Sequence, residues 1–289
     1  MILVGPVGSG KTSLINAMIN YVLGVKWTNV FWFLLCDEQK TSETVVYQIN
    51  HQEGFQVDFS LTIIDTPGFG DFQRDGQTTE QIKHLFKDLV NLHAVCLVLQ
   101  SPSARLTPKL RFTLDSMLSF FGKDISENIM ILVTFADDLQ PPVLEAAVPW
   151  PRTEDGLPVH YKFNNSALFV LSQTSSDPTE ESFWRMGNKN MEAFFSKLEK
   201  TQPNDLSLTR EVEQRRLRLK DLLLSLRWGN ENQRVECSEA LNRLKEVALK
   251  PKPLFTPEHI KMLIKEEESE KKPGWSERVR SLKIMKFEA

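Results

Sequence analysis

The feature that most restricts the fold is a glycine-rich octapeptide near the N-terminus, Gly-Pro-Val-Gly-Ser-Gly-Lys-Thr over residues 5–12. It follows a short apolar run, residues 1–4, and opens an amphipathic stretch that predicts a helix over residues 11–23. Glycines at these places let the backbone curl, so that consecutive N–H groups form a concave nest at a helix N-terminus. The pattern and its context predict a P-loop that binds phosphate, rather than an ordinary glycine turn.

The residue types within the octapeptide have separate chemical roles. The lysine supplies a positive charge for the β- and γ-phosphates of a nucleotide, and the threonine hydroxyl is an oxygen ligand for Mg²⁺. The residues that we expect to hold the phosphates are Gly5, Gly8, Ser9, Gly10, Lys11, Thr12 and Ser13. Lys11 is also the first candidate for a catalytic group.

The rest of the chain alternates strand-like and helix-like segments. Two β-rich runs, residues 44–49 and 57–64, flank a turn at Gly54 and predict a hairpin, which would put an antiparallel edge on the sheet. Further strands are expected over residues 94–99, 129–135 and 160–170, and further helices over 79–91, 107–121 and 182–200. This alternation is typical of right-handed βαβ units and predicts an α/β fold with a mostly parallel sheet.

Acidic residues at two predicted strand ends extend the candidate site, because ligands bind at the carboxyl ends of parallel strands. Asp65, at the start of Asp-Thr-Pro-Gly, is expected to hold Mg²⁺ through water, and the N–H of Gly68 to approach the γ-phosphate. Asp137, in Thr-Phe-Ala-Asp, can accept hydrogen bonds from N1–H and the 2-amino group of guanine, which adenine lacks. The alternative is that Asp137 and Asp138 only begin a loop.

A polar cluster interrupts the last predicted strand, at residues 163–167. Asn165 and the backbone N–H of Ala167 are candidates for contacts with the edge of the base. The adjacent asparagines, residues 164–165, fit a turn equally well.

These motifs resemble those of septin and immunity-associated (GIMAP-like) GTPases, over about residues 1–200. Residues 61–71 are similar to septins, and the immunity-associated group is resembled at residues 120–122, 134–137 and 164–165. The overall pattern resembles septin-type G-domain proteins of fish. The resemblance implies a Ras-like P-loop G domain, with helices on both faces of the sheet, that binds GTP or GDP with Mg²⁺.

The resemblance also implies roles for two further residues. Thr44 corresponds to the switch I threonine, a Mg²⁺ ligand and catalytic group. Thr41 and Ser42 are the alternatives for this role. Phe69 stands where Ras-like enzymes place a glutamine that orients the attacking water, so we expect slow hydrolysis. In the resembled groups, dimerisation through the G domain supplies what is missing, and we expect a homodimer or oligomer here.

Two regions lie outside these motifs. Residues 27–36 are unusually apolar for a loop, and are interpreted as a buried excursion, an interaction patch or an error of the gene model. After the G domain, residues 1–200, we expect a charged helical extension over 201–249, long enough for a short coiled coil. Residues 250–289 are expected to form a linker and a charged, partly disordered tail.

The sequence as a whole predicts a guanine-nucleotide-binding protein with slow, Mg²⁺-dependent GTP hydrolysis that controls self-assembly or partner binding. The alternatives are a nucleotide-gated or degenerate scaffold with negligible hydrolysis, and a P-loop protein that uses ATP. A formal net charge of −3 gives no reason to expect nucleic acid as a partner, and peripheral membrane association is left open without support. The three cysteines are far apart, which favours a reducing, cytoplasmic location.

Overall fold

The computed structural model describes residues 1–35, 42–70, 75–102, 108–146, 159–169, 178–225 and 231–249, with a few positions between 261 and 280. The chain divides into two compact units. The first unit contains residues 1–105 and 124–206, and the second contains residues 106–123 and 207–289. The alternative switch I residue Thr41 and most of the predicted tail lie outside the described residues.

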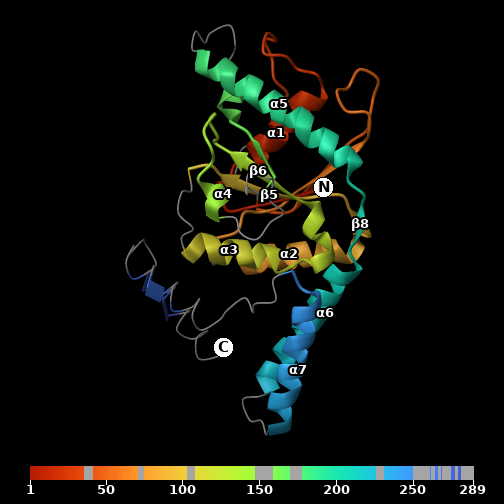
Figure 1. Cartoon of the computed structure of the whole chain (residues 1–289), viewed down its shortest axis with the longest axis vertical. Helices are drawn as coiled ribbons and strands as arrows, with labels where there is room; N and C mark the ends of the chain where they lie inside the picture. The colour runs from red at the N-terminus through yellow and green to blue at the C-terminus, as the bar shows by residue number, and fades with distance from the viewer. Residues whose placement is uncertain are drawn as a thin grey trace. The chain divides into compact units, whose positions relative to one another are not determined.

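The first unit is built on a six-stranded sheet, of which Figure 1 labels β5 and β6. Its strand order is β2-β3-β1-β5-β6-β7. Its strands are β1 (Ile2–Val4), β2 (Val45–Ile49), β3 (Leu61–Asp65), β5 (Val95–Gln100), β6 (Ile129–Thr134) and β7 (His160–Lys162). Neighbouring strands are parallel except for β2 and β3, which are antiparallel. The predicted α/β fold, a mostly parallel sheet with one antiparallel edge strand, is confirmed.

The central strands are apolar because both of their faces are covered. Every residue of β1 is buried, and β5 is buried from Val95 to Leu99. Strands of this kind read as continuous apolar runs rather than alternating ones. In contrast, the edge strand β2 exposes Val45 and Val46.

Helices cover both faces of this sheet, as predicted. The helices described in the first unit are α1 (Lys11–Val22), α2 (Asp75–Asp88), α4 (Val143–Ala146) and α5 (Pro178–Lys200), whereas α3 (Pro108–Leu118) belongs to the second unit. Leu14 and Met18 of α1 and Phe194 of α5 share one core cluster with side chains of the sheet. Helices α1 and α5 therefore cover one face, whereas α2 lies on the other (Figure 1). Helix α1 ends near Gly24, whose left-handed φ of 72° suits the residue that follows a helix.

Three sequence predictions need correction. The second hairpin strand begins at Leu61 rather than at residue 57, because residues before it form a loop in which the backbone N–H of His51 donates to Ser60 Oγ at 3.0 Å. The predicted strand over 160–170 is only β7, followed by a 3₁₀ helix, Asn165–Phe169. The third correction is α4, which buries Val143 and Leu144 where the sequence predicted no helix.

A second, two-stranded antiparallel ladder was not predicted. It pairs β4 (Asn91–Leu92) with β8 (Asn204–Asp205). Near it, Asn128 Nδ2 donates to the carbonyls of His93 and Gln202, at 2.9 Å each. Two-residue strands carry no periodic signal, so only long-range pairing reveals them.

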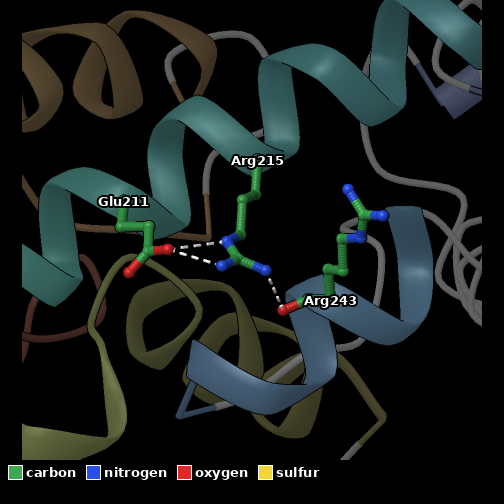
Figure 2. A network of polar contacts seen from close by, with 3 residues as sticks. All are labelled: Glu211, Arg215 and Arg243. Carbon is green, nitrogen blue, oxygen red and sulfur yellow. Dashed lines mark hydrogen bonds and ion pairs between the residues drawn. The ribbon is translucent and has the colours of Figure 1, made fainter. Parts of the chain in front are cut away.

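The second unit contains a helical hairpin of α6 (Ser207–Ser225) and α7 (Glu231–Val247), which lie side by side in Figure 1. Its apolar seam consists of Val212, Leu219, Leu244 and Ala248. Figure 2 shows that the guanidinium of Arg215 donates to the carboxylate of Glu211 on its own helix, and at 2.8 Å to the carbonyl of Arg243. The charged side chains thus add a link between two helices. No helix among the described residues is long and apolar enough to cross a membrane.

Two glycine substitutions test the packing of the first unit. A Cβ on Gly68 would lie 2.5 Å from Val7 Cα, so Gly68→Ala should destabilise the fold by about 1–3 kcal/mol. A Cβ on Gly187, in the interior of α5, would meet nothing within 4 Å, so Gly187→Ala should stabilise by about 0.5–1 kcal/mol. Urea denaturation midpoints of the two variants measure both effects, and equal shifts would contradict the packing described here.

Candidate phosphate-binding site

The loop between β1 and α1 has the backbone geometry of a phosphate cradle. Gly8 and Gly10 have φ values of 78° and 77°, in the left-handed region that favours glycine. Gly5 is required for a different reason, because a Cβ there would lie 2.4 Å from the carbonyl oxygen of Val98. The loop ends at the N-terminus of α1, where backbone N–H groups and the helix dipole favour an anion.

Lys11 is the buried charge of this loop. Its side chain is 6% exposed, and Nζ donates to the carbonyl oxygens of Gly5 and Pro6 at 3.1 Å each. Burial lowers the pKa of Lys11 to about 8, against an opposite and smaller effect of the Asp65 carboxylate. The ammonium is thus held inside the curl of the loop, where a phosphate would stabilise its charged form.

Thr12 and Asp65 come together from α1 and β3. Thr12 Oγ1 donates to Asp65 Oδ2 at 3.4 Å, and Asp65 is buried at the last position of its strand. A hydroxyl and a carboxylate next to a phosphate cradle are the hard oxygen donors that Mg²⁺ prefers. The chemistry of this pair fits the ion, which would be held by Thr12 and, directly or through water, by Asp65.

The Asp-Thr-Pro-Gly segment is fastened to the phosphate loop by backbone hydrogen bonds. The N–H of Val7 donates to the carbonyl of Phe69 at 2.8 Å, and the N–H of Phe69 donates to the carbonyl of Gly5 at 3.1 Å. Gly68 packs directly against Val7, and this contact leaves no space for a Cβ on Gly68. The ring of Phe69 is 2% exposed, so it is buried in the protein and is not part of the open site.

Asp137 lies at the other side of the site, just beyond β6. It is exposed, and its Oδ1 accepts a hydrogen bond from the N–H of Leu139 at 3.0 Å. Lys162 Nζ donates to the carbonyls of Asp137 and Leu139, at 2.9 and 3.2 Å. The carboxylate is therefore presented to solvent on a loop that Lys162, at the end of β7, braces.

The two residues predicted to contact the edge of the base, Asn165 and Ala167, lie just after β7. Asn165 and Ala167 belong to the 3₁₀ helix, and Asn165 is half-buried. Asn164 makes two side-chain hydrogen bonds: its Nδ2 donates to the carbonyl of Ala136 at 3.1 Å, and its Oδ1 accepts from the N–H of Ser166 at 3.2 Å. Asn164 thus links the start of the 3₁₀ helix to the segment before Asp137. Contacts of Asn165 and Ala167 with a base stay a prediction.

Thr44 precedes β2 and faces α2. Its N–H and its hydroxyl both donate to Gln81 Oε1, at 2.9 and 3.3 Å. Gln81 Nε2 donates to the carbonyl of Ser42 at 3.4 Å. The hydroxyl that donates to Gln81 keeps its oxygen lone pairs, and the assignment of Thr44 as a Mg²⁺ ligand stays a prediction.

Sequence reasoning missed three residues that shape the site. Gln100 Nε2 donates to the carbonyl of Gly8 at 2.7 Å, and Thr66 Oγ1 donates to the carbonyl of Leu3 at 2.7 Å. Lys162 is the third. Gln100 and Lys162 are polar residues that end strands of a parallel sheet, and this position was the available signal.

The apolar segment after α1 is attached to that helix by buried asparagines. Asn20 Nδ2 donates to the carbonyl of Phe33 at 2.7 Å, and the N–H of Leu35 donates to Asn16 Oδ1 at 3.0 Å. The exposed side chains of the segment are Val30, Phe31, Phe33, Leu34 and Leu35. The interpretation as a buried excursion is therefore wrong for these five side chains, and an interaction patch stays a hypothesis.

Known proteins share parts of this sequence and fold. The family model described as AIG1 family matches residues 1–149. No curated protein matches the chain. Among solved structures, the chain is similar to Toc33 from Arabidopsis thaliana in complex with Mg²⁺ and GMPPNP, at 18% identity over 70% of this chain and 85% of that one, with a TM-score of 0.46. It is also similar to the signal recognition particle receptor SRb-GTP/SRX complex from Chaetomium thermophilum, at 16% identity over 65% and 96%, with a TM-score of 0.36.

The pKa of Lys11 gives a prediction for anion binding. Below pH 8 the Lys11 side chain is a charged ammonium, whereas above pH 8 it loses its proton, so the lysine contributes less to binding as the pH rises. The ratio of pyrophosphate affinities between the wild type and Lys11→Ala should fall about tenfold from pH 7 to pH 9. Calorimetric titration of both proteins at each pH measures the ratio and cancels the titration of pyrophosphate itself. A ratio independent of pH would contradict this role.

Proposed function

The chain belongs to the AIG1 family, and from this premise we propose that it is a guanine-nucleotide-binding protein that uses GTP or GDP with Mg²⁺. The observation that carries the proposal is the meeting of the phosphate cradle, the buried ammonium of Lys11 and the Thr12–Asp65 pair at one edge of the sheet. A nucleotide would place its β- and γ-phosphates over the N-terminus of α1, with Mg²⁺ neutralising their charge.

Guanine specificity is assigned to Asp137. Its carboxylate is exposed, and Lys162 fixes the loop through backbone carbonyls rather than through the carboxylate itself. The carboxylate therefore keeps acceptor capacity for the two N–H donors of guanine, N1–H and the 2-amino group. Adenine offers neither donor, which separates this proposal from a P-loop protein that uses ATP.

Competition between nucleotides tests this assignment. A fluorescent GDP analogue bound to the wild type with Mg²⁺ should be displaced by GTP at concentrations at least about tenfold lower than by ATP, because paired hydrogen bonds to a carboxylate favour guanine. Asp137→Ala should lose that preference, and the matched control Asp138→Ala, an exposed neighbour, should keep it. Equal displacement by ATP and GTP from the wild type would contradict guanine specificity and favour the ATP alternative.

Hydrolysis is proposed to be slow in the isolated chain. The reaction adds a water oxygen to the γ-phosphorus and breaks the bond to the β–γ bridging oxygen, and it requires a group that orients the water. The residue after Gly68 is Phe69, whose ring is buried and has no polar atom. We therefore propose that a second copy, bound through the G domain, supplies the missing group and that nucleotide state controls this self-assembly. The second candidate function is a scaffold with negligible hydrolysis, which Phe69 also favours because it cannot orient water.

Further parts of the proposal rest on the sequence. These are the likeness of residues 61–71 to septins, the division into a G domain over 1–200, a helical extension over 201–249 and a tail over 250–289, a short coiled coil, and a cytoplasmic location. The pairing of α6 with α7 supports the helical extension. A coiled coil with another copy would have to use the faces of these helices that do not pack against each other. Sedimentation of residues 201–289 alone would test whether this region self-associates.

Turnover as a function of protein concentration distinguishes an enzyme from a scaffold. GTP hydrolysis per molecule should be slow in dilute protein and should rise with concentration if a second copy completes the site. Phe69→Gln should not restore fast hydrolysis, because the side chain at this position is buried; it should instead lower the free energy of unfolding by about 2–4 kcal/mol. Fast turnover of dilute Phe69→Gln would show that the glutamine reaches the site, contrary to this proposal.

A further inference from the structure

The segment that follows α1 presents large apolar side chains to solvent from a base of packed tryptophans. The side chains, each between 46% and 64% exposed, are Val30, Phe31, Phe33, Leu34 and Leu35. We refer to these five side chains as the apolar patch. Within the same segment, Trp32 packs against Trp184 of α5 with ring centroids 4.6 Å apart, and the ring centroid of Trp27 lies 6.2 Å from that of Trp184. The tryptophans fasten the segment to α5, so the apolar patch is presented on an ordered support.

Side chains of α1 make hydrogen bonds with the backbone that carries the apolar patch. Asn20 binds both backbone polar groups of Phe33: its Oδ1 accepts from the N–H at 2.9 Å, and its Nδ2 donates to the carbonyl at 2.7 Å. Asn16 Oδ1 accepts from the N–H of Leu35 at 3.0 Å. Both asparagines are buried. Because an unpaired backbone group is costly in apolar surroundings, these bonds allow this part of the segment to leave water.

The charges along this segment are compatible with a lipid surface. Residues 24–36 contain a single charged residue, Lys26, and it is exposed. A cation beside aromatic and aliphatic side chains is the arrangement that rests on lipid headgroups, because apolar groups enter the acyl boundary while the cation stays with the phosphates. One lysine gives only a weak electrostatic attraction, so the burial of apolar surface must supply most of the affinity.

The size of the apolar patch also favours a membrane over a protein partner. Five side chains that are each about half exposed present roughly 500 Å² of apolar surface, a size at which exposed patches mark interaction sites. Each side of a stable protein–protein interface buries about 800 Å². The apolar patch is too small to form such an interface by itself. Membrane binding has no such requirement, because its strength scales with whatever apolar area is inserted.

We propose that the apolar patch inserts into the surface of a phospholipid bilayer, at the boundary between headgroups and acyl chains. Trp27 and Trp32 would lie at this boundary, where indole rings are favoured, and Lys26 would meet the headgroups. Asn16 and Asn20 would replace the water that the backbone of the segment loses on insertion. The first unit would then rest on the membrane through this segment, and the inference is independent of which nucleotide the phosphate loop binds.

Flotation of the full chain with phosphatidylcholine vesicles tests this inference. The wild type should float with them, and its affinity should change less than about threefold between low and high salt, because apolar burial is not screened. Phe31→Ser and Leu34→Ser should each weaken binding about tenfold or more, since each removes roughly 100 Å² of inserted apolar surface. Both side chains are exposed, so the variants should keep the unfolding midpoint of the wild type. Val90→Ser is the matched control: Val90 is 62% exposed but lies between α2 and β4, and this variant should float as the wild type does.

Several results would overturn the inference. If the wild type does not float with phosphatidylcholine vesicles, with or without phosphatidylserine, the bilayer is not what covers the apolar patch. Binding that requires phosphatidylserine, disappears at high salt and survives in Phe31→Ser and Leu34→Ser would be electrostatic adsorption through another surface. An equal loss in Val90→Ser would show that the apolar patch is not the specific contact. Self-association without flotation, abolished by Phe31→Ser in sedimentation velocity, would identify a second copy of the chain as the partner instead.

Discussion

The hydrogen bonds from the buried ammonium of Lys11 to the carbonyls of Gly5 and Pro6 are the interaction on which the site depends. A charged group at this depth is costly unless it is well hydrogen-bonded, and the lowered pKa records that cost. The curl of the loop supplies carbonyl partners, and a bound phosphate would supply the opposite charge. The site is thus built to favour an anion.

The phosphate loop is held in place from several strands at once. Phe69, which follows β3, bonds with residues of the loop, Gln100 at the end of β5 binds the carbonyl of Gly8, and Thr134 at the end of β6 binds the carbonyl of Ser9. This convergence follows from strand order, because β1 lies between β3 and β5, and β6 is next. Parallel pairing brings the carboxyl ends of these strands to one edge of the sheet, so hydrogen bonds reach the phosphate loop from the end of each strand.

Much of this arrangement could be predicted because local patterns carry it. The octapeptide specifies its own turn, and the apolar runs at β1, β5 and β6 are long or isolated enough to be read as strands. The ladder of β4 and β8 could not be predicted, since two-residue strands have no period. Lys162 was missed for a related reason: a single lysine after a strand looks like any solvated surface residue until the Asp137 loop is placed beside it.

The sequence by itself determined the α/β class, the P-loop and the acidic residues that end its strands, because each depends on residues close together in the chain. Only the tertiary structure decided which side chains reach the loop from a distance, that the ring of Phe69 is buried, and that the ring of Phe135 is exposed. Burial and the direction of a side chain depend on contacts between segments far apart in the chain. Phe69 follows the Asp-Thr-Pro-Gly segment and Phe135 follows β6, and hydrogen bonds tie both backbone regions to segments that are distant in the sequence.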